Sequence, residues 1–433
     1  MNKQILRLAI PNIISNLSIP LLSSVDTALV GHLGEVYYLG AIAVGGMIFN
    51  FIYWGFGFLR MGTTGLTAQA YGQKNNKESL LVFSRALIVA ATGSAVLLLF
   101  QKPILDFTFT FVGSSPEVEE YARIYFNIRI WAAPATLSMY GIQGWFLGMQ
   151  NAKDPMLMTI FVNLLNILFN IIFIYRFGMT VDGVAYGTVA AAYLGLLFGL
   201  FLLLKRYNHL RKAFEPNGII DLTGIKQFFF VNRDILIRTL CVIFAFSFFT
   251  AKSAEFGDDI LAANTILLQL WAILSYGVDG FAYAAESLSG RYIGAKDHPG
   301  LIKAIKYTLG WGLGMGAGIA VIYILFGGVI VSLFTDNQTI ITLALSYFAW
   351  TAAAPLINSL CFIWDGIFLG ATATKPMRNS MLAAIIIVYL PVYYSTIGFL
   401  GNHALWLSMT LFMVFRGLTL TWYARKEFWE NSR

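Results

Sequence analysis

Long apolar stretches recur from one end of this 433-residue chain to the other, and they restrict its fold more than any motif does. Only 12% of the residues are charged, against about 25% in a soluble domain. Crossing the hydrocarbon of a bilayer takes about 20 apolar residues per helix, and a helix satisfies its own backbone groups there. We therefore predict an all-α polytopic membrane protein with about twelve transmembrane helices, at residues 8–32, 38–66, 80–101, 122–148, 155–177, 183–204, 230–252, 259–287, 304–334, 341–369, 377–399 and 403–424.

Two halves of the sequence repeat each other at an offset of 222 positions. The stretch GWFLG at 144–148 returns as GIFLG at 366–370, and GQKN at 72–75 returns as GAKD at 294–297. A period this long exceeds that of a solenoid repeat but fits a duplicated helix bundle, as in secondary transporters. We expect two pseudo-symmetric six-helix bundles: an N-terminal lobe at 1–210, a cytoplasmic linker at 211–225 and a C-terminal lobe at 226–433.

Basic residues are distributed unevenly between the segments that join the predicted helices. With the N-terminus inside, twenty Lys and Arg residues fall in inner segments, and three (Lys102, Arg176 and Lys252) fall in outer ones. The positive-inside rule then places both termini in the cytoplasm, and we expect a multi-pass protein of the bacterial inner membrane. The net charge of +7 does not indicate a nucleic-acid partner, because the basic residues lie mainly in these inner segments.

Several classes of function lack support in the sequence. No Gly-rich loop ends in Lys-Ser or Lys-Thr, which argues against an ATP-driven pump. A membrane-embedded enzyme would need a nucleophile–base pair or a His-rich metal site, and the four histidines are scattered without ligand spacing. We expect no enzyme activity, no cofactor and no metal. The expected partners of this monomer are the lipid bilayer, small organic substrates and a coupling ion.

Asp26 is the ionisable residue whose position in the membrane most needs a reason. A charge at the bilayer centre costs at least about 2.5–3.5 kcal/mol, and a short carboxylate cannot reach the interface as Lys and Arg do. Asp26 follows Pro11 and Pro20 in the first predicted helix, and proline can bend a helix. Desolvation favours the protonated form of such a carboxyl group, so Asp26 is a candidate proton carrier. The alternative is a neutral or paired Asp26 that only packs the bundle.

The fifth predicted helix carries Asn163, Asn166 and Asn170, whose spacings of three and four residues put them on one face. Amides inside a membrane often join helices through hydrogen bonds. The alternative is that they form the polar wall of a cavity that faces Asp26, together with Thr188 of the sixth helix.

The second half carries acids where the first half has none. At the offset of 222, Asp365 corresponds to Gln143 and Glu286 corresponds to Thr64. Aromatic residues are dense around these acids, and a carboxylate beside aromatic faces suits cationic or amphipathic organic ligands. Pairing of Glu286 with a nearby arginine is the structural alternative. The candidate substrate cavity comprises Gln143, Arg60, Asp279, Tyr283, Glu286 and Asp365.

Several blocks of the sequence resemble one known family. They are VDTALVGHLG at 25–34, preceded by Pro11, LRMGTTGLTAQA at 59–70, DGFAYA at 279–284, MRNSM at 377–381 and GNHALWL at 401–407. These blocks resemble the multidrug and toxic compound extrusion (MATE) family and, within it, the branch named after the DNA-damage-inducible protein F. The resemblance extends over essentially the whole chain.

The resemblance implies a twelve-helix antiporter with two lobes around a central cleft, which exports organic, often cationic, compounds in exchange for H⁺ or Na⁺. The family's coupling site maps to Asp26, with Pro11 as the bending proline and Asn166 and Thr188 as polar partners. The family usually has an Asp four residues after that Asn, and this chain has Asn170 there. Asp26 then remains the single titrating group of its lobe, and we expect coupling to H⁺.

Two alternatives stay open. One is the same transporter coupled to Na⁺. The other is a flippase for lipids or lipid-linked oligosaccharides, whose cavity arginines bind phosphates; Arg60, Arg85 and Arg238 keep it open. Position 248, equivalent to Asp26, is a phenylalanine, so we expect the first lobe to handle the ion and the second to contribute more to the substrate surface.

Overall fold

Helices make up nearly all of the described chain. The computed structural model describes residues 1–31, 35–219 and 221–430, and within these ranges it holds α-helices with short 3-10 and π-helical segments and no strand. The helices divide into two compact units, which we call the N-unit (residues 14–232) and the C-unit (residues 1–13 with 233–433). The predicted all-α class is confirmed, and the predicted lobe boundaries at 210 and 226 stay a prediction.

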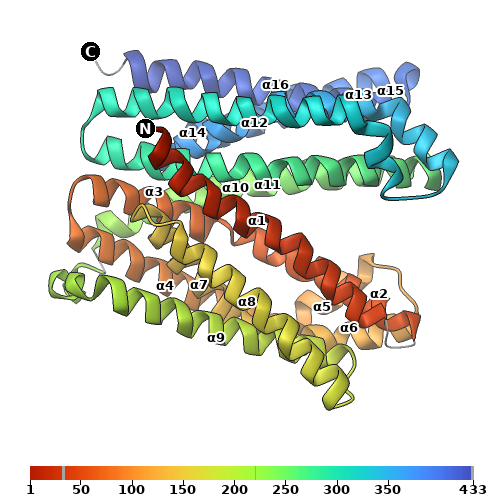
Figure 1. Cartoon of the computed structure of the whole chain (residues 1–433), viewed down its shortest axis with the longest axis horizontal. Coiled ribbons are helices and arrows are strands. Elements are labelled where there is room, and N and C mark those ends of the chain that lie inside the picture. Colours follow the sequence, from red (N-terminus) through yellow and green to blue (C-terminus); the bar gives the residue numbers. More distant parts are fainter. Residues whose placement is uncertain (32–34, 220, 431–433) are drawn as a thin grey trace. The chain divides into compact units, whose positions relative to one another are not determined.

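The first helix, α1 (Asn2–Gly31), contributes residues to both units. In the rest of the N-unit, α3 packs against α4 and α7, α8 packs against α9, and α2 packs against α6; Figure 1 shows α8 and α9 side by side. The helices are α2 (Val36–Gly55), α3 (Phe58–Gly72), α4 (Asn76–Leu99), α5 (Gln101–Phe111), α6 (Pro116–Arg129), α7 (Ala133–Gly148), α8 (Lys153–Ile171) and α9 (Val181–Tyr207), with η1 (Ile130–Ala132), η2 (Ile172–Arg176), η3 (Asn208–Ala213) and η4 (Pro216–Gly218) between or after them.

The C-unit is organised around α13, which packs against α11, α12 and α16. A buried polar network joins three of its helices, because Asn264 donates to Ser253 and Asn402 at 2.7 Å each and accepts from the Trp406 indole at 2.9 Å. The helices are α10 (Leu222–Ala254), whose residues 222–232 belong to the N-unit, α11 (Asp258–Gly294), α12 (His298–Ser332), α13 (Gln338–Gly370), α14 (Thr374–Ala383), η5 (Ala384–Tyr389), α15 (Leu390–Leu400), α16 (His403–Ala424) and η6 (Arg425–Glu430).

Each of the twelve predicted membrane spans falls on one or more helical segments; residue 32, the last of the first predicted span, lies outside the described residues. Among the residues that the structure describes, ten helical runs are long and apolar enough to cross a bilayer, from Tyr37–Gly72 to His403–Glu430. The other two predicted spans lie on α1 and on the continuous run α6–η1–α7, whose first part is rich in acids. The structure adds the short helix α5, which the sequence pattern did not predict.

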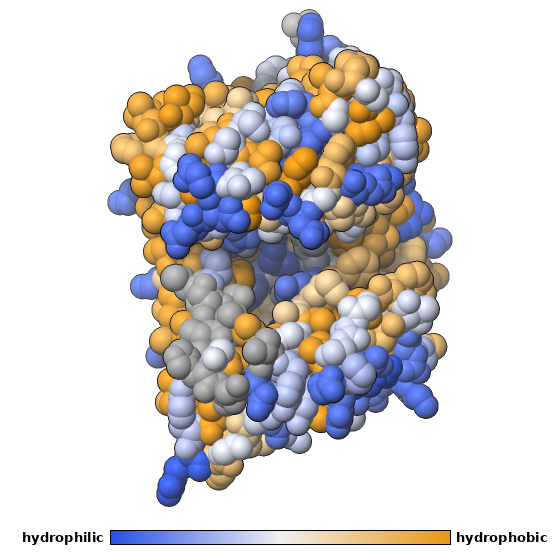
Figure 2. Space-filling view, turned by 90° about the vertical axis from the view of Figure 1, so that its right-hand side faces the viewer, coloured by the Kyte–Doolittle hydropathy of each residue, from blue (hydrophilic) through white to orange (hydrophobic). Residues whose placement is uncertain are grey.

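Large apolar side chains are exposed along the helices, as a bilayer-embedded surface requires. Leu99, Leu333 and Phe399 are each more than 70% exposed. Hydrophobic residues cover a large share of the surface visible in Figure 2, next to hydrophilic patches. Exposed apolar area on this scale is unusual for a water-soluble monomer and is ordinary against lipid.

The repeat is visible in the backbone, residue by residue. Lys74 and Lys296, 222 positions apart, adopt left-handed φ angles of 57° and 56°. The next residues, Asn75 and Asp297, cap the following helices by accepting from the backbone N–H groups of Glu78 and Gly300. The GQKN and GAKD stretches are therefore the same turn, in which a side-chain oxygen satisfies a helix N-terminus.

Glycines mark the second shared feature, a close helix crossing in each unit. A Cβ on Gly144 would meet the Arg60 carbonyl, and a Cβ on Gly366 would meet the Ala282 carbonyl, the equivalent contact 222 positions later. Only glycine lets the backbones approach this closely. This explains why GWFLG returns as GIFLG, and it confirms the two pseudo-symmetric bundles.

We expect Gly144→Ala and Gly366→Ala each to destabilise the protein by about 1–3 kcal/mol, because the added methyl group overlaps a backbone carbonyl that cannot move away. Gly314→Ala in α12 is the matched control, since nothing lies within 4 Å of its Cβ position. This control should be neutral or slightly stabilising. Thermal unfolding of the purified variants in one detergent measures the difference, and three equal midpoints would contradict the shared crossing.

Candidate functional site

Three predicted polar residues of the N-unit form one hydrogen-bonded chain between α8 and α9. The Asn170 amide donates to the Asn166 carbonyl oxygen at 3.0 Å, and the Asn166 amide donates to the Thr188 hydroxyl at 3.0 Å. Thr188 in turn donates to the Val184 carbonyl at 3.0 Å. Asn166 and Asn170 are buried, so the chain places oriented amides in the interior of the unit.

A further amide joins this face of α8 to α1. Asn163 donates to the Ser18 hydroxyl at 2.9 Å. Asp26 lies in the same helix, eight residues after Ser18, and its side chain is outside the described part of the structure. Asn170 follows Asn163 by seven residues. At a rise of about 1.5 Å per residue, the distance along α1 from Ser18 to Asp26 nearly equals the distance along α8 from Asn163 to Asn170. The two helices run in the same direction in Figure 1. From this spacing we expect the backbone of Asp26 to lie near the level of Asn170.

Gly187 of α9 leaves room for the side chain of Asn170. A Cβ at Gly187 would overlap the side-chain carbonyl of Asn170, so the absence of a side chain on α9 lets Asn170 fit against the backbone. Gln143 of α7 lies half-buried in the same unit.

In the C-unit, Asp365 is held by two arginines. Its Oδ2 accepts from Arg238 at 2.5 Å and from Arg416 at 2.7 Å, so this triad connects α13 with α10 and α16. Asp365 is 4% exposed and Arg416 is 3% exposed. The carboxylate predicted for the substrate cavity is therefore engaged in ion pairs within the protein.

The other predicted residues of the candidate cavity lie on α11 and α3. Asp279, Tyr283 and Glu286 are spaced by four and three residues, which places them on one face of α11. Glu286 is buried, and Asp279 and Tyr283 are half-buried. Arg60 is half-buried on α3. In the described ranges, no group of three or more metal-binding side chains lies together.

Sequence reasoning missed a second buried ion-pair cluster, centred on Asp234 of α10. Its carboxylate accepts from Arg378 at 2.7 Å, from Arg233 at 3.2 Å and from the Thr374 hydroxyl at 3.2 Å. A buried Asp between two basic residues clamps α10 to α14. The sequence feature that pointed to this cluster is the MRNSM block at 377–381, which contains Arg378, the partner of Asp234.

Comparison with known proteins decides the family. The MatE family model matches residues 11–172 and residues 235–395, most of the chain in two stretches of nearly equal length. The chain belongs to the MATE family. The DNA damage-inducible protein F of Escherichia coli (strain K12) is 37% identical over 431 residues, covering 100% of this chain and 93% of that protein. A probable multidrug resistance protein NorM of Photorhabdus laumondii is 24% identical over 90% of this chain and 86% of its own length.

Solved MATE structures share the fold. An outward-facing multidrug resistance MATE transporter superposes with a TM-score of 0.87 at 20% identity, covering 98% of this chain and 95% of that one. A MOP superfamily transporter from Pyrococcus furiosus, described as having a binding pocket of reversed polarity, gives a TM-score of 0.88 at 19% identity, covering 100% and 96%. The family resemblance found in the sequence is thus confirmed, and the chain is a multi-pass membrane transporter of the MATE type.

We expect Asp365→Asn to destabilise the C-unit by on the order of 3–5 kcal/mol, because it leaves the buried guanidinium of Arg416 without its anion. Asp336→Asn, at an exposed position between α12 and α13, is the control and should leave stability unchanged. Unfolding midpoints in detergent measure both. A stable Asp365→Asn variant would show that the triad does not hold these helices together.

Proposed function

We propose that this MATE transporter is a proton-coupled antiporter of the bacterial inner membrane, with both termini in the cytoplasm, which exports cationic or amphipathic organic compounds by alternating access. The observation that carries the proposal is the buried chain Asn170–Asn166–Thr188, hydrogen-bonded beside the helix that contains Asp26. In this proposal Asp26 binds and releases the coupling proton. The names of the relatives, multidrug resistance and detoxification proteins among them, support the class of substrate.

The internal repeat supports a place for Asp26 beside these amides. Phe248, at the position equivalent to Asp26, contacts the rings of Tyr389 and Tyr393 at 5.5 and 5.1 Å between centroids. Tyr389 and Tyr393 follow Asn166 and Asn170 by 223 positions, one more than the 222-position offset that relates Asp26 to Phe248. In this proposal, the aromatic cluster of the C-unit corresponds to a cluster of Asp26 with the amides in the N-unit.

Amides suit a neighbour that changes its protonation state. The side chain of Asn170 offers both N–H donors and a carbonyl acceptor. It can accept a hydrogen bond from a protonated Asp26 and donate one to the carboxylate, without itself gaining or losing a proton. An aspartate at position 170 would instead repel the charged form of Asp26. Asn170 therefore leaves Asp26 as the titrating group of the cluster.

The division of α1 between the two units supports coupling of this proton to a conformational change. Residues 1–13, which include Pro11, belong to the C-unit, whereas Ser18 and Asp26 belong to the N-unit. Pro11 lacks the N–H of a regular helical hydrogen bond, so the helix bends more easily there. A change in the contacts of Asp26 thus acts on a helix that both units hold, and protonation can shift the balance between two arrangements.

The flippase alternative depends on arginines that are free to bind phosphate, and two of them are engaged inside the protein. Arg238 is paired with Asp365. Arg85 donates to Glu78 at 2.7 Å and to the Gly218 carbonyl at 3.0 Å, which attaches the linker to α4. We therefore favour the antiporter. The transport experiment below also tests the alternative that the antiporter is coupled to Na⁺.

We expect Asp26→Asn to reduce pH-gradient-driven efflux of a cationic dye from proteoliposomes by at least about tenfold, because the asparagine cannot exchange a proton; a tenfold loss corresponds to about 1.4 kcal/mol. Glu117→Gln at the start of α6 removes an exposed acid and is the control for loss of charge. Separate H⁺ and Na⁺ gradients identify the coupling ion. Full transport by Asp26→Asn, or efflux that follows only the Na⁺ gradient, would overturn the proposal.

A further inference from the structure

Two polar side chains of α13, Thr351 and Asn358, are buried without a hydrogen-bond partner among the residues that the structure describes. The groups concerned are the Thr351 hydroxyl and both the N–H₂ and the carbonyl oxygen of Asn358. Both residues are 0% exposed. Their spacing of seven residues places them on one face of the helix. A buried polar group without a partner is costly, and more so at a depth where the bilayer offers no water.

Pro355 lies between these two residues, inside α13. A proline has no N–H, so the carbonyl of Thr351 loses its regular helical donor. The Ser359 hydroxyl donates to the Pro355 carbonyl at 2.5 Å. Gly316 of α12 packs on this point, since a Cβ there would meet both groups of that bond. Within the described chain, the helical backbone thus loses a hydrogen bond in the turns whose side chains are unpaired.

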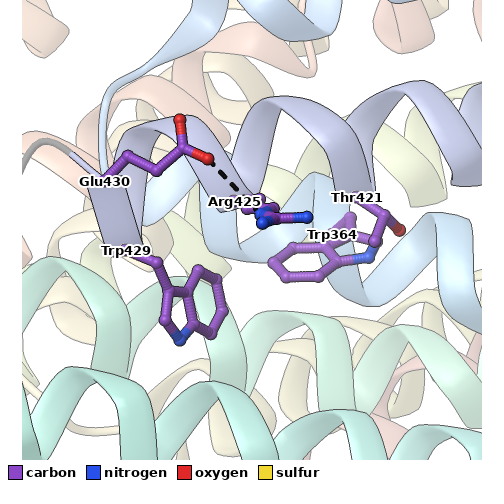
Figure 3. A pocket seen from close by; sticks show the side chains of 5 residues that line it. All are labelled: Trp364, Thr421, Arg425, Trp429 and Glu430. Carbon is purple, nitrogen blue, oxygen red and sulfur yellow. Dashed lines mark ion pairs between the residues drawn. The ribbon is translucent and has the colours of Figure 1, made fainter.

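The parts of α13 on either side of Pro355 are held by different neighbours. Before it, the ring of Phe348 contacts Tyr323 of α12 at 6.1 Å between centroids. After it, α13 crosses α11 closely and takes part in the ion-pair triad with α10 and α16. Near the end of α13, Trp364 and Thr421 of α16 line one open depression (Figure 3). A bend at Pro355 can therefore move one part of α13 relative to the other.

We propose that α13 bends at Pro355 during transport, and that Thr351 and Asn358 then face water as polar lining of the path of the transported compound. The inference rests on the alternating access proposed above, but not on the coupling ion. A hydroxyl and an amide accept from N–H and O–H groups of an organic cation without holding it by charge. In the arrangement described here this lining is closed. Bending gives its polar groups water as a partner, which offsets part of the cost of opening.

The first experiment removes the unpaired amide. Asn358→Leu, of similar volume, should raise the thermal unfolding midpoint in detergent by about 2 °C, because no polar group is then buried unpaired at this position. It should reduce efflux of a cationic dye from proteoliposomes about tenfold, since leucine favours the closed arrangement by about 1.4 kcal/mol. Asn358→Ser keeps a polar group and should retain most of the efflux. The control Asn264→Leu should lower the midpoint, because Asn264 is hydrogen-bonded in the buried network of the C-unit.

Cysteine labelling in proteoliposomes tests the opening without measuring transport. The background chain carries Cys241→Ala and Cys361→Ala, which remove both native thiols. In it, Asn358→Cys should react with N-ethylmaleimide at least about tenfold faster than Ile363→Cys, because a thiol ionises in water and stays protonated in an apolar interior. Ile363 is the matched control: it is also 0% exposed, but it lies on another side of α13, against α12.

Several results would overturn the inference. A lower unfolding midpoint for Asn358→Leu, or its failure to fold, would show that the amide stabilises the arrangement described here. Equal labelling of Asn358→Cys and Ile363→Cys, or equal efflux by the leucine and serine variants, would show that this face stays closed. If Asn358→Cys does not fold, Thr351→Cys replaces it. Full transport by Asp26→Asn would reject the proton proposal alone, since fast labelling at position 358 does not depend on the coupling ion.

Discussion

The close approach of two backbones at glycine is the contact on which both units are built. In the N-unit, α7 reaches the Arg60 carbonyl of α3 at Gly144, and in the C-unit α13 reaches the Ala282 carbonyl of α11 at Gly366. In a bilayer, helices gain little from burying apolar side chains against each other, so close van der Waals contact contributes most of the attraction. The remaining helices pack around these crossings, which explains why they were retained when so much else changed.

The buried polar residues at the predicted sites differ in charge between the two units. At the predicted sites, the N-unit buries the neutral amides Asn166 and Asn170, whereas the C-unit buries the charged triad around Asp365. Neutral amides can meet a partner in two protonation states at low cost, but a triad of paired charges resists change. The duplicated scaffold thus holds an adaptable amide cluster in one unit and a rigid charged triad in the other.

Features set by local chemistry were predictable from the sequence, and features set by long-range pairing were not. Apolar length predicted the helices, and a three-and-four spacing predicted that Asn166 and Asn170 share a face. In contrast, Asp365 meets Arg238 and Arg416 from 127 and 51 positions away, and no spacing rule selects these partners among the buried arginines. The helix α5 was not predicted, because the apolar pattern identifies only helices long enough to span a bilayer and α5 is shorter.

The division of α1 restricts how such a chain can be recombined. Although the two halves repeat each other, residues 1–13 pack in the unit formed by 233–433, where a side chain at Gly280 would meet Ile13 and the Ala9 carbonyl. A chimera that joined halves of two relatives at the linker would therefore place the start of one parent against α11 of the other. Two halves are compatible only if residues 1–13 fit the C-unit that they pack in, and if the linker also matches. The duplication did not produce two interchangeable modules, because residues 1–13 pack in the same unit as residues 233–433.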